Sequence, residues 1–248
     1  MDATLGVGAE AAGPFRRFYG HMVPAQPAVV GLHNFQHVKP DFSEHAIFVN
    51  LDGERFDDEY LGDEVTVQAA VRQREAIAIL IYDEAIRRTK ASPPDDADPG
   101  ADRIASIRQS GGQILEAESL DALAQQMAVA WTVPARKLHE TVTRYNAACA
   151  AADASSLDIS KSGGLCPITT PPFYAVRMKP GITFTYGGVR INAKTEVLDS
   201  AGQRIEGLYA AGADAGGVYT RGYTGGLSLA LAFGLIAGKR AAERLKPK

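Results

Sequence analysis

A glycine-rich segment, residues 207–227, holds the groups best suited to chemistry in this chain. It reads GLYAAGADAGGVYTRGYTGGL and places Asp214, Arg221 and Tyr223 among the glycines. Glycines let backbone N–H groups come close to a ligand. The start of a helix after the segment adds unpaired N–H donors with partial positive charge. The segment is therefore predicted to cradle an anionic or strongly polar ligand.

Tight turns in a core would also explain isolated glycines. Three Gly-Gly pairs fall in the last third of the chain, however, at residues 187–188, 216–217 and 225–226, with Tyr, Arg and Asp between them. This pattern favours a ligand site over turns alone. Donors at Leu227 and Ser228 would suit N1 and O2 of a flavin, which gain negative charge when the ring is reduced.

Other polar clusters are not expected to be catalytic or metal sites. His33 and His37 are four residues apart, but their surroundings and those of His45 lack a helical pattern, so no shared metal ion is predicted. The acidic run at residues 57–59 is interpreted as a charged turn. The sequence contains neither a GxSxG nor an HExxH motif.

Composition limits the remaining classes of function. The 248 residues suffice for one or two domains, and 46% hydrophobic and 22% charged residues are typical of globular proteins. A net charge of -3 argues against a nucleic-acid partner. No apolar run is long enough to span a membrane, and no signal peptide is recognised. The two cysteines, Cys149 and Cys166, show no disulfide or CxxC pattern. We therefore expect a cytoplasmic protein that binds neither nucleic acid nor membrane.

The predicted elements give an α/β fold. Residues 46–50 and 76–83 are apolar runs of strand length, and residues 65–74 have a helical pattern. Ser119 is a suitable N-cap for a helix over residues 120–130, and Pro134 suits the first turn of the next helix. Residues 189–205 are predicted to form a hairpin around DSAG, followed by a buried strand at 206–212 and a helix at 227–245.

These segments resemble one family of flavoproteins along nearly the whole chain. Residues 186–212, 216–226 and 233–245 are similar to the C-terminal flavin-binding signature of the fumarate reductase and succinate dehydrogenase flavoproteins, which include 3-ketosteroid and tricarballylate dehydrogenases. IFVNLDGERFDDE, LHETVTRYNAACA and PPFYAVRMKPG resemble parts of the family's capping domain and of its return to the flavin domain. The resemblance covers residues 8–245.

The resemblance implies a domain organisation and a cofactor. Residues 1–22 would be a residual flavin-domain helix and junction, 23–180 an α+β capping domain for the substrate, and 181–248 the C-terminal hairpin, strand and helix of a Rossmann-like FAD domain. FAD would contact residues of the glycine-rich segment: Gly212, Ala213, Asp214, Gly225, Gly226, Leu227 and Ser228. Asp214 lies one position beyond the acid that binds the ribityl chain in the family, and a turn or N-cap role is its alternative.

The family's strand–GxGxxG–helix unit for the FAD pyrophosphate has no counterpart in this sequence. The LGVGAEAAG stretch follows no apolar strand, so it cannot take that role. We therefore expect the FAD site to be completed by a partner chain or by a segment lost from this one. Uncovered sheet edges and the apolar face of the last helix also predict a homo-oligomer or a heteromer.

Three positions depart from the fumarate reductases. Asp63 lies at the position of the arginine that donates the proton in those enzymes. Phe184 lies at the position of a histidine that binds the substrate. Tyr223 lies at the position of a second arginine that binds the substrate, and Arg221 is the alternative residue for that position. Because two carboxylates would lose charged partners, fumarate and succinate are not the expected substrates.

The expected reaction is hydrogen transfer across a carbon–carbon bond next to a carbonyl or carboxylate of a small molecule. Tyr223 and the backbone near Gly226 would hold the developing oxyanion, Arg221 would pair with a carboxylate or with a surface acid, and Tyr186 or His21 would be the acid or base. A packed aromatic role is an equal alternative for Tyr186. The rival hypothesis is a cofactor-free binding or interaction module derived from the family.

Overall fold

The structure is a computed structural model that describes residues 1–91, 102–220, 222 and 225–244. Contacts within the chain divide it into two compact units. The terminal unit combines Met1–Gly20 with Ile182–Lys248, and the central unit is His21–Gly181. Each unit is described by itself below. The assignment of the two units to a flavin domain and a capping domain stays a prediction.

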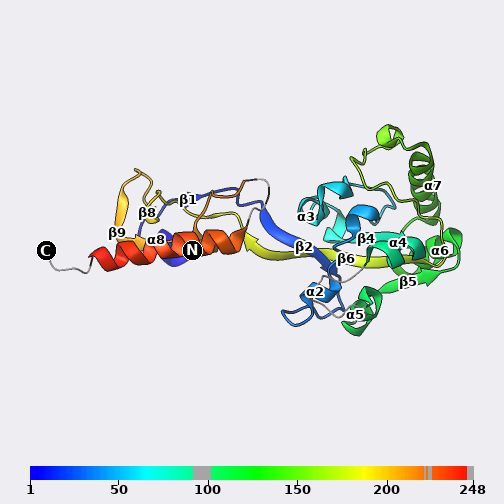
Figure 1. Ribbon diagram of the computed structural model, residues 1–248, viewed down its shortest axis with the longest axis horizontal. Helices are drawn as coiled ribbons and strands as arrows, with labels where there is room; N and C mark the ends of the chain where they lie inside the picture. Colours follow the sequence, from blue (N-terminus) through cyan, green and yellow to red (C-terminus); the bar gives the residue numbers. More distant parts are fainter. Residues whose placement is uncertain (92–101, 221, 223–224, 245–248) are drawn as a thin grey trace. The chain divides into compact units, whose positions relative to one another are not determined.

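A five-stranded sheet forms the core of the central unit (Figure 1). Its order is β2 (Phe18–Pro24), β6 (Phe173–Thr185), β4 (Ala78–Asp83) and β3 (Ile47–Val49), and β5 (Ile114–Ala117) also pairs with β6. The β3–β4, β4–β6 and β5–β6 pairs are antiparallel, with Leu80 opposite Val176. All residues of β4 are buried, which explains its continuous apolar sequence.

Helices surround this sheet. They are α2 (Phe35–Val38), α3 (Asp63–Ala70), α4 (Glu84–Lys90), α5 (Arg103–Gln109), α6 (Leu120–Trp131) and α7 (Ala135–Ala151), with short 3-10 turns at η1 (Ser43–His45), η2 (Glu59–Leu61), η3 (Arg74–Ala76) and η4 (Ala154–Ser156). The predicted cap of α6 is confirmed, because Ser119 Oγ accepts the Ala122 N–H at 3.1 Å. Leu138, Val142 and Tyr145, spaced four and three residues apart, are buried on one face of α7.

The terminal unit contains short strands and one long helix. Its elements are α1 (Asp2–Gly6), β1 (Ala11–Ala12), β7 (Gly188–Val189), β8 (Glu196–Leu198), β9 (Arg204–Tyr209), η5 (Gly212–Asp214) and α8 (Gly226–Arg244). β1 pairs with β7, and β8 pairs with β9 in the predicted hairpin. The prediction of a separate buried strand after the hairpin is wrong. Residues 206–209 belong to β9, the second arm, and none of the residues of β9 is buried.

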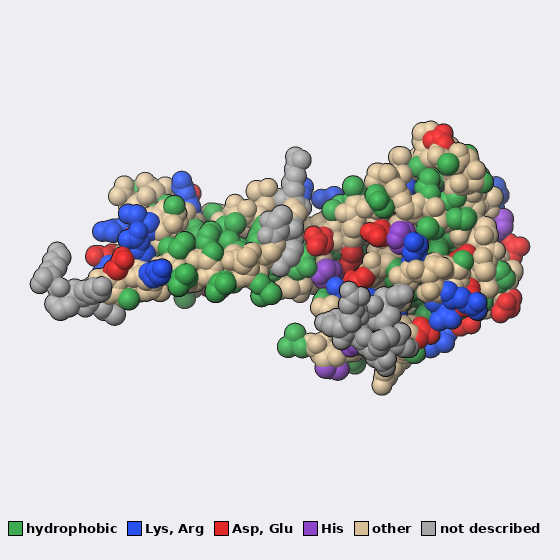
Figure 2. All heavy atoms as spheres, in the orientation of Figure 1, with side chains coloured by type: hydrophobic (Ala, Val, Ile, Leu, Met, Phe, Trp, Pro, Cys, Tyr) green, Lys and Arg blue, Asp and Glu red, His purple; other side chains and the backbone are tan. Residues whose placement is uncertain are grey.

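The long helix α8 has no buried residue. Leu227, Leu231 and Leu235, spaced four apart, are exposed at 87%, 75% and 57%. Figure 2 shows hydrophobic side chains gathered along this helix. The small core of the terminal unit lies around the hairpin instead, where Val189 and Val197 are buried. In the part of the chain that the structure describes, no helix is both long and apolar enough to cross a membrane.

Candidate functional site

The start of α8 and the turn η5 form the described part of the predicted cradle. η5 lies against α8, and a Cβ added at Gly212 would be 3.4 Å from the Cβ of Ala230. Ala213 and Asp214 are exposed beside this contact. The predicted site residues of η5 and of the first turn of α8 therefore lie on two elements that pack together.

The first turn of α8 leaves backbone donors available for a ligand. Since the helix begins at Gly226, the N–H groups of residues 226–228 have no acceptor within the helix by its geometry. Ser228 Oγ donates to the Gly225 carbonyl at 2.7 Å, so its hydroxyl hydrogen points back to the preceding turn. Gly225 has a φ of 88°, which a residue with a side chain would adopt only with strain. These features fit the polar edge of a flavin.

One glycine of each of the other two pairs, Gly188 and Gly216, allows close backbone packing, and Gly187 lies against the Phe15 ring. A Cβ at Gly216 would lie 2.6 Å from the Gly188 nitrogen, and one at Gly188 would lie 2.7 Å from the Gly216 nitrogen. A Cβ at Gly13 would lie 2.6 Å from the Tyr186 oxygen. Close packing therefore explains Gly188 and Gly216 without a ligand, and the pair at 225–226 remains for the predicted ligand.

Tyr186 lies in an aromatic cluster of the terminal unit, defined as Tyr19, Phe184, Tyr186 and Tyr219. The rings of Tyr186 and Tyr219 are 5.6 Å apart, and those of Phe184 and Tyr186 are 6.0 Å apart. Only 4% of Tyr186 is exposed. This is the packed aromatic arrangement weighed against a catalytic role. Arg221 and Tyr223, the other predicted catalytic residues of this unit, lie outside the described residues.

His21, the remaining predicted acid or base, pairs with Asp63 inside the central unit. Its Nδ1 lies 2.9 Å from Asp63 Oδ2, and both side chains are 11% exposed. The Met22 N–H donates to Asp63 Oδ1 at 3.0 Å and to Oδ2 at 3.2 Å. Burial raises the pKa of Asp63, while the hydrogen bonds from His21 and Met22 oppose that rise. A carboxylate fixed by backbone donors thus orients an imidazole.

The sequence names both members of this pair but does not join them. His21 lies on β2 and Asp63 is the first residue of α3, so 42 positions separate them. The only available signal was that Asp63 stands at the position where the resemblance places an arginine. No local spacing rule relates a strand to a helix start so far along the chain.

A second polar group of the central unit is a buried ion network. Arg55 donates to Glu59 at 2.6 Å, and Lys161 Nζ lies 3.6 Å from the same carboxylate and donates to the Ala46 carbonyl. Glu59 is the first residue of the turn η2 and is fully buried, so the charged turn predicted at residues 57–59 reaches into the interior of the unit. Burial lowers the pKa of Lys161, although Glu59 opposes this effect. Because its positive and negative charges are paired with one another, we interpret the network as a contribution to the structure of the unit and not as a ligand site.

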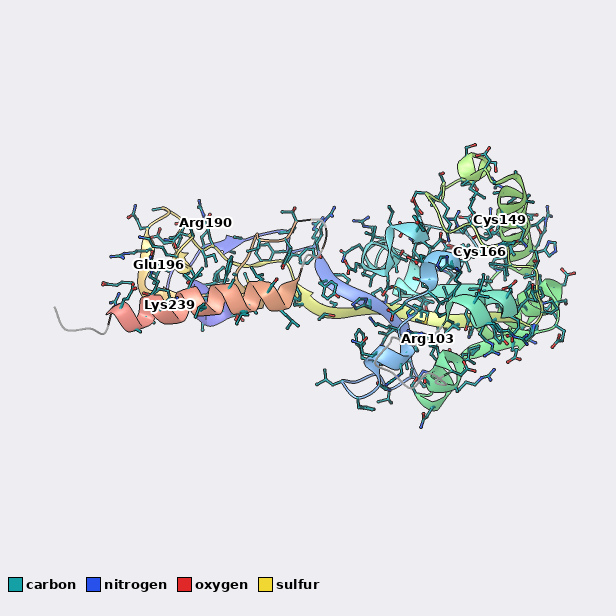
Figure 3. The ribbon with its side chains drawn as sticks, in the orientation of Figure 1. Arg103, Cys149, Cys166, Arg190, Glu196 and Lys239 are labelled. Atoms are coloured by element: carbon teal, nitrogen blue, oxygen red, sulfur yellow. The ribbon has the colours of Figure 1, made fainter. Side chains whose placement is uncertain are left out.

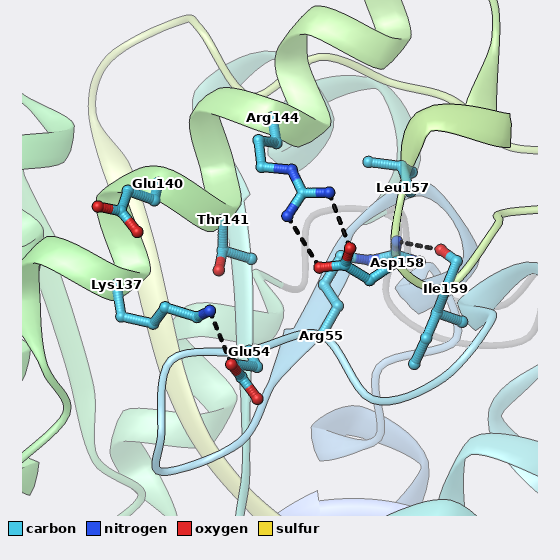
Figure 4. A pocket seen from close by; sticks show the side chains of 9 residues that line it. All are labelled: Glu54, Arg55, Lys137, Glu140, Thr141, Arg144, Leu157, Asp158 and Ile159. Carbon is cyan, nitrogen blue, oxygen red and sulfur yellow. Dashed lines mark hydrogen bonds and ion pairs between the residues drawn. The ribbon is translucent and has the colours of Figure 1, made fainter.

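A surface pocket lies next to this network (Figure 4). Its lining consists of Glu54, Arg55, Lys137, Glu140, Thr141, Arg144, Leu157, Asp158 and Ile159. The charges are paired: Lys137 with Glu54 at 2.7 Å and Arg144 with Asp158 at 2.8 Å. Exposed pairs of this kind are common on protein surfaces and contribute little. The pocket therefore carries no excess charge that would select a ligand.

The cysteines and histidines of the central unit form no metal site in the described chain. Cys149 on α7 and Cys166 are both free thiols (Figure 3), and Cys166 Sγ lies 3.8 Å from His45 Nδ1. His33 and His37 line a separate surface hollow with Ser106. Within residues 1–91, 102–220 and 225–244, no three His, Cys, Asp or Glu side chains gather in a way that could hold a metal ion.

The fold is shared with flavoproteins of known structure. The crystal structure of 3-ketosteroid delta1-dehydrogenase from Sterolibacterium denitrificans matches with a TM-score of 0.72 and 23% identity, over 98% of this chain and 46% of its own. This likeness defines the class, a mixed α/β protein with part of a flavoprotein fold. The model of the family described as FAD binding domain matches residues 8–229. The chain therefore belongs to this family, as the resemblance predicts.

Two relatives of the family are similar in sequence. NADH:acrylate oxidoreductase of Vibrio harveyi is 33% identical over 202 residues, which cover 81% of this chain and 19% of the relative. Fumarate reductase (cytochrome) of Shewanella frigidimarina is 30% identical over 203 residues, which cover 81% of this chain and 32% of the relative. The matched region thus spans less than about a third of the length of either curated relative.

Proposed function

We propose that this chain is part of an FAD-dependent oxidoreductase that transfers hydrogen across a carbon–carbon bond next to a carbonyl or carboxylate. The observation that carries the proposal is the match of the FAD binding domain family to residues 8–229. The relatives named for acrylate and fumarate support the substrate class, because both compounds have a double bond beside a carboxylate.

Residues of the terminal unit would hold the cofactor. The N–H groups at the start of α8 would face the flavin's N1 and O2, and Asp214 would bind the hydroxyls of the ribityl chain. When bound, FAD supplies hydride chemistry. Tyr223 would hold the substrate oxygen while Arg221 pairs with a carboxylate. Fumarate and succinate are not the proposed substrates, since Asp63 and Phe184 replace charged or polar partners.

We propose further that the FAD site is completed outside this chain segment. The leucines exposed on α8 support a partner surface, because a contiguous apolar patch exposed on a helix marks a site of interaction with another surface. The covering surface would belong to a partner carrying the nucleotide-binding unit or to a second copy of this chain. A cofactor-free binding module is the rival proposal.

The first test is an absorbance spectrum of the purified chain, before and after FAD is added and the excess removed. Flavin bands that stay with the chain support the proposal for this segment alone. If none stay, the experiment is repeated with the chain that supplies the strand–GxGxxG–helix unit. A complex that also retains no flavin would support the cofactor-free module instead.

A further inference from the structure

We propose that Cys166 and Cys149 form a redox site in the central unit, at which a hydroperoxide oxidises Cys166 and Cys149 then joins it in a disulfide. Both residues are free cysteines and half-buried (Figure 3). Partial exposure of this kind is what a reactive cysteine requires. The proposal rests on the contacts of the two cysteines within the central unit, and it does not depend on the proposed function.

His45 provides a base for the Cys166 thiol. Cys166 Sγ lies 3.8 Å from His45 Nδ1, within reach of a hydrogen bond from sulfur. The other ring nitrogen, Nε2, lies 3.2 Å from Glu44 Oε1. Because an ionised carboxylate can only accept a hydrogen bond, Nε2 carries the ring hydrogen and Nδ1 is the acceptor for the thiol proton. A thiol beside a histidine that a third group orients is the arrangement of an activated nucleophile.

Charged groups on neighbouring elements keep His45 neutral. Burial lowers its pKa, and Lys90 and Lys161 lower it further, while Glu44 opposes them. A neutral imidazole can take the proton of the Cys166 thiol, whereas an imidazolium cannot. The His45 side chain is 22% exposed, so it can afterwards exchange that proton with water.

The side chain of Asn146 holds the Cys166 segment against α7. Cys166 lies between η4 and β6, outside any helix or strand. Two residues after it, the Ile168 N–H donates to Asn146 Oδ1 at 2.8 Å, and Asn146 Nδ2 donates to the Ile168 carbonyl at 2.8 Å. Since Cys149 stands on the same helix three positions after Asn146, the two cysteines are brought to one place.

The Tyr145 hydroxyl lies between the two cysteines. It accepts the backbone N–H of Cys166 at 3.3 Å and hydrogen-bonds with the thiol of Cys149, one helical turn along α7. Lys161 Nζ lies 5.6 Å from the centre of the Tyr145 ring and interacts electrostatically with both cysteines. A shared hydroxyl and a shared cation thus define one cluster that contains both sulfurs.

The two thiols have different roles in this cluster. Burial raises the pKa of Cys149, although the hydrogen bond with Tyr145 and the charge of Lys161 oppose the rise. Cys149 therefore remains a protonated thiol. Cys166, which has a base in contact with its sulfur, is the thiol that attacks the peroxide.

The proposed steps balance. The Cys166 thiol gives its proton to His45 and its sulfur attacks one oxygen of the hydroperoxide. The S–O bond forms as the O–O bond breaks, the sulfur loses two electrons, and the leaving alkoxide or hydroxide takes the proton from His45. Cys149 then attacks the resulting sulfenic acid, so that the S–S bond forms and the hydroxyl leaves as water with the Cys149 proton. One hydroperoxide thus becomes one alcohol, or water, and a second water.

The first part of the test uses the whole folded chain and hydrogen peroxide. After a brief treatment, free thiols are blocked with N-ethylmaleimide and the peptides are identified by mass spectrometry. The wild type should contain a disulfide between Cys149 and Cys166 that dithiothreitol reverses. Cys149→Ser should instead accumulate a sulfenic acid at Cys166, which dimedone traps, and Cys166→Ser should keep Cys149 as a thiol. A wild type in which both cysteines remain thiols, or in which only disulfides between chains form, would overturn the proposal.

The second part measures how fast peroxide removes the Cys166 thiol. His45→Gln should slow this reaction at least about 10-fold, because the base is lost. His139→Gln is the matched control, since the His139 side chain on α7 is 46% exposed and pairs with Asp121. It should keep the wild-type rate, and melting curves by circular dichroism check that each variant is folded.

Unfolding the wild type in urea supplies the same comparison without a substitution. It should slow the reaction of Cys166 at least about 10-fold as well, because the contact with His45 depends on the fold. Equal rates in the folded and the unfolded chain would overturn the activation of Cys166. None of these measurements requires bound FAD, so their failure would leave the proposed function standing.

Discussion

Glu59 carries its negative charge in the interior of the central unit. Besides Arg55 and Lys161, it accepts the backbone N–H of Phe48 at 3.0 Å. Replacing it by Gln would leave two cations in a buried site with no anion. Since the loss of one member of a buried ion pair costs about 3–5 kcal/mol, Glu59→Gln is expected to lower the free energy of unfolding by that amount.

Urea denaturation followed by circular dichroism measures this change. The matched control is Glu54→Gln, which removes an exposed carboxylate from its pair with Lys137 at 2.7 Å. A change of less than about 1 kcal/mol is expected there. Equal losses in the two variants would show that the buried network contributes no more than a surface pair.

Asp57 is expected to make the chain's stability depend on pH. Burial raises the pKa of this carboxyl above its ordinary value of 3.8, and its Oδ2 is buried without a hydrogen-bond partner in the described residues. The folded state therefore binds this proton more tightly than the unfolded state. The resulting stabilisation is fully present below pH 3.8 and is lost as the pH rises through the elevated pKa.

Asp57→Asn should remove this contribution, so that the variant loses less stability than the wild type between pH 3.8 and neutrality. Melting temperatures measured across that range test the expectation. Asp121→Asn is the control, because the Asp121 side chain is 84% exposed. If the slopes for wild type and Asp57→Asn coincide, Asp57 is not the group responsible.

At the scale of residues, the sequence identifies candidates but not their partners. Asp63 and His21 were both named, yet their contact joins β2 to α3 across 42 positions. Glu59 looked like a turn residue because two acids precede it, and only the fold brings Lys161 to it. Such contacts depend on tertiary packing, which no local spacing reports.

The start of α8 is the element whose role can be tested most directly. Gly225 has a φ of 88°, and a Cβ there would lie 2.8 Å from Ser228 Oγ. Gly225→Ala would therefore disturb the first turn whose N–H groups are proposed to face the flavin. We expect FAD to bind at least about 10-fold more weakly, a change of about 1.4 kcal/mol in binding free energy.

Fluorescence titration of FAD measures this effect in whichever form of the protein retains the cofactor. Gly202→Ala is the matched control, because Gly202 also has a positive φ, 75°, but an added Cβ meets nothing within 4 Å in the β8–β9 turn. Both variants should lose similar stability. Equal FAD affinity in the two would argue against a role for the α8 start.

Elements with strong local signals were predicted well. β4 has a continuous apolar run, α6 has the Ser119 cap, and α7 has apolar residues at helical spacing, and all three are present. Residues 206–212 are predicted as a buried core strand, but 206–209 belong to the second arm of a hairpin and are not buried. Whether a strand such as β9 is buried depends on the elements that pack against it, and the apolar and polar pattern of the strand itself does not specify those elements.

At the scale of the whole molecule, the family and the mixed α/β class could be predicted because several long segments resemble one family together. The oligomeric state could not be predicted in the same way. It depends on surfaces such as α8, whose leucines the described chain leaves exposed. An apolar stripe of this kind favours association with another surface.

The exposed leucines of α8 lead to a prediction for the isolated chain. Leu231 and Leu235 are 75% and 57% exposed, so burying them in a second copy would remove apolar surface from water at about 25 cal/mol per Å². We expect the purified chain to self-associate at micromolar concentration. Leu231→Glu combined with Leu235→Glu should give a monomer, because buried carboxylates would be desolvated in the interface.

Light scattering after gel filtration measures the mass of each form, and the melting temperature checks that the fold is kept. The double variant should melt within a few degrees of the wild type when both are compared as monomers at low concentration, since neither leucine is buried within the chain. Val129→Glu is the control: Val129 is 87% exposed on α6, away from any apolar stripe, and its loss should leave the mass unchanged. If the wild-type chain is instead a well-folded monomer at all concentrations, α8 needs no covering surface. The exposed leucines would then no longer support the proposal of a partner chain.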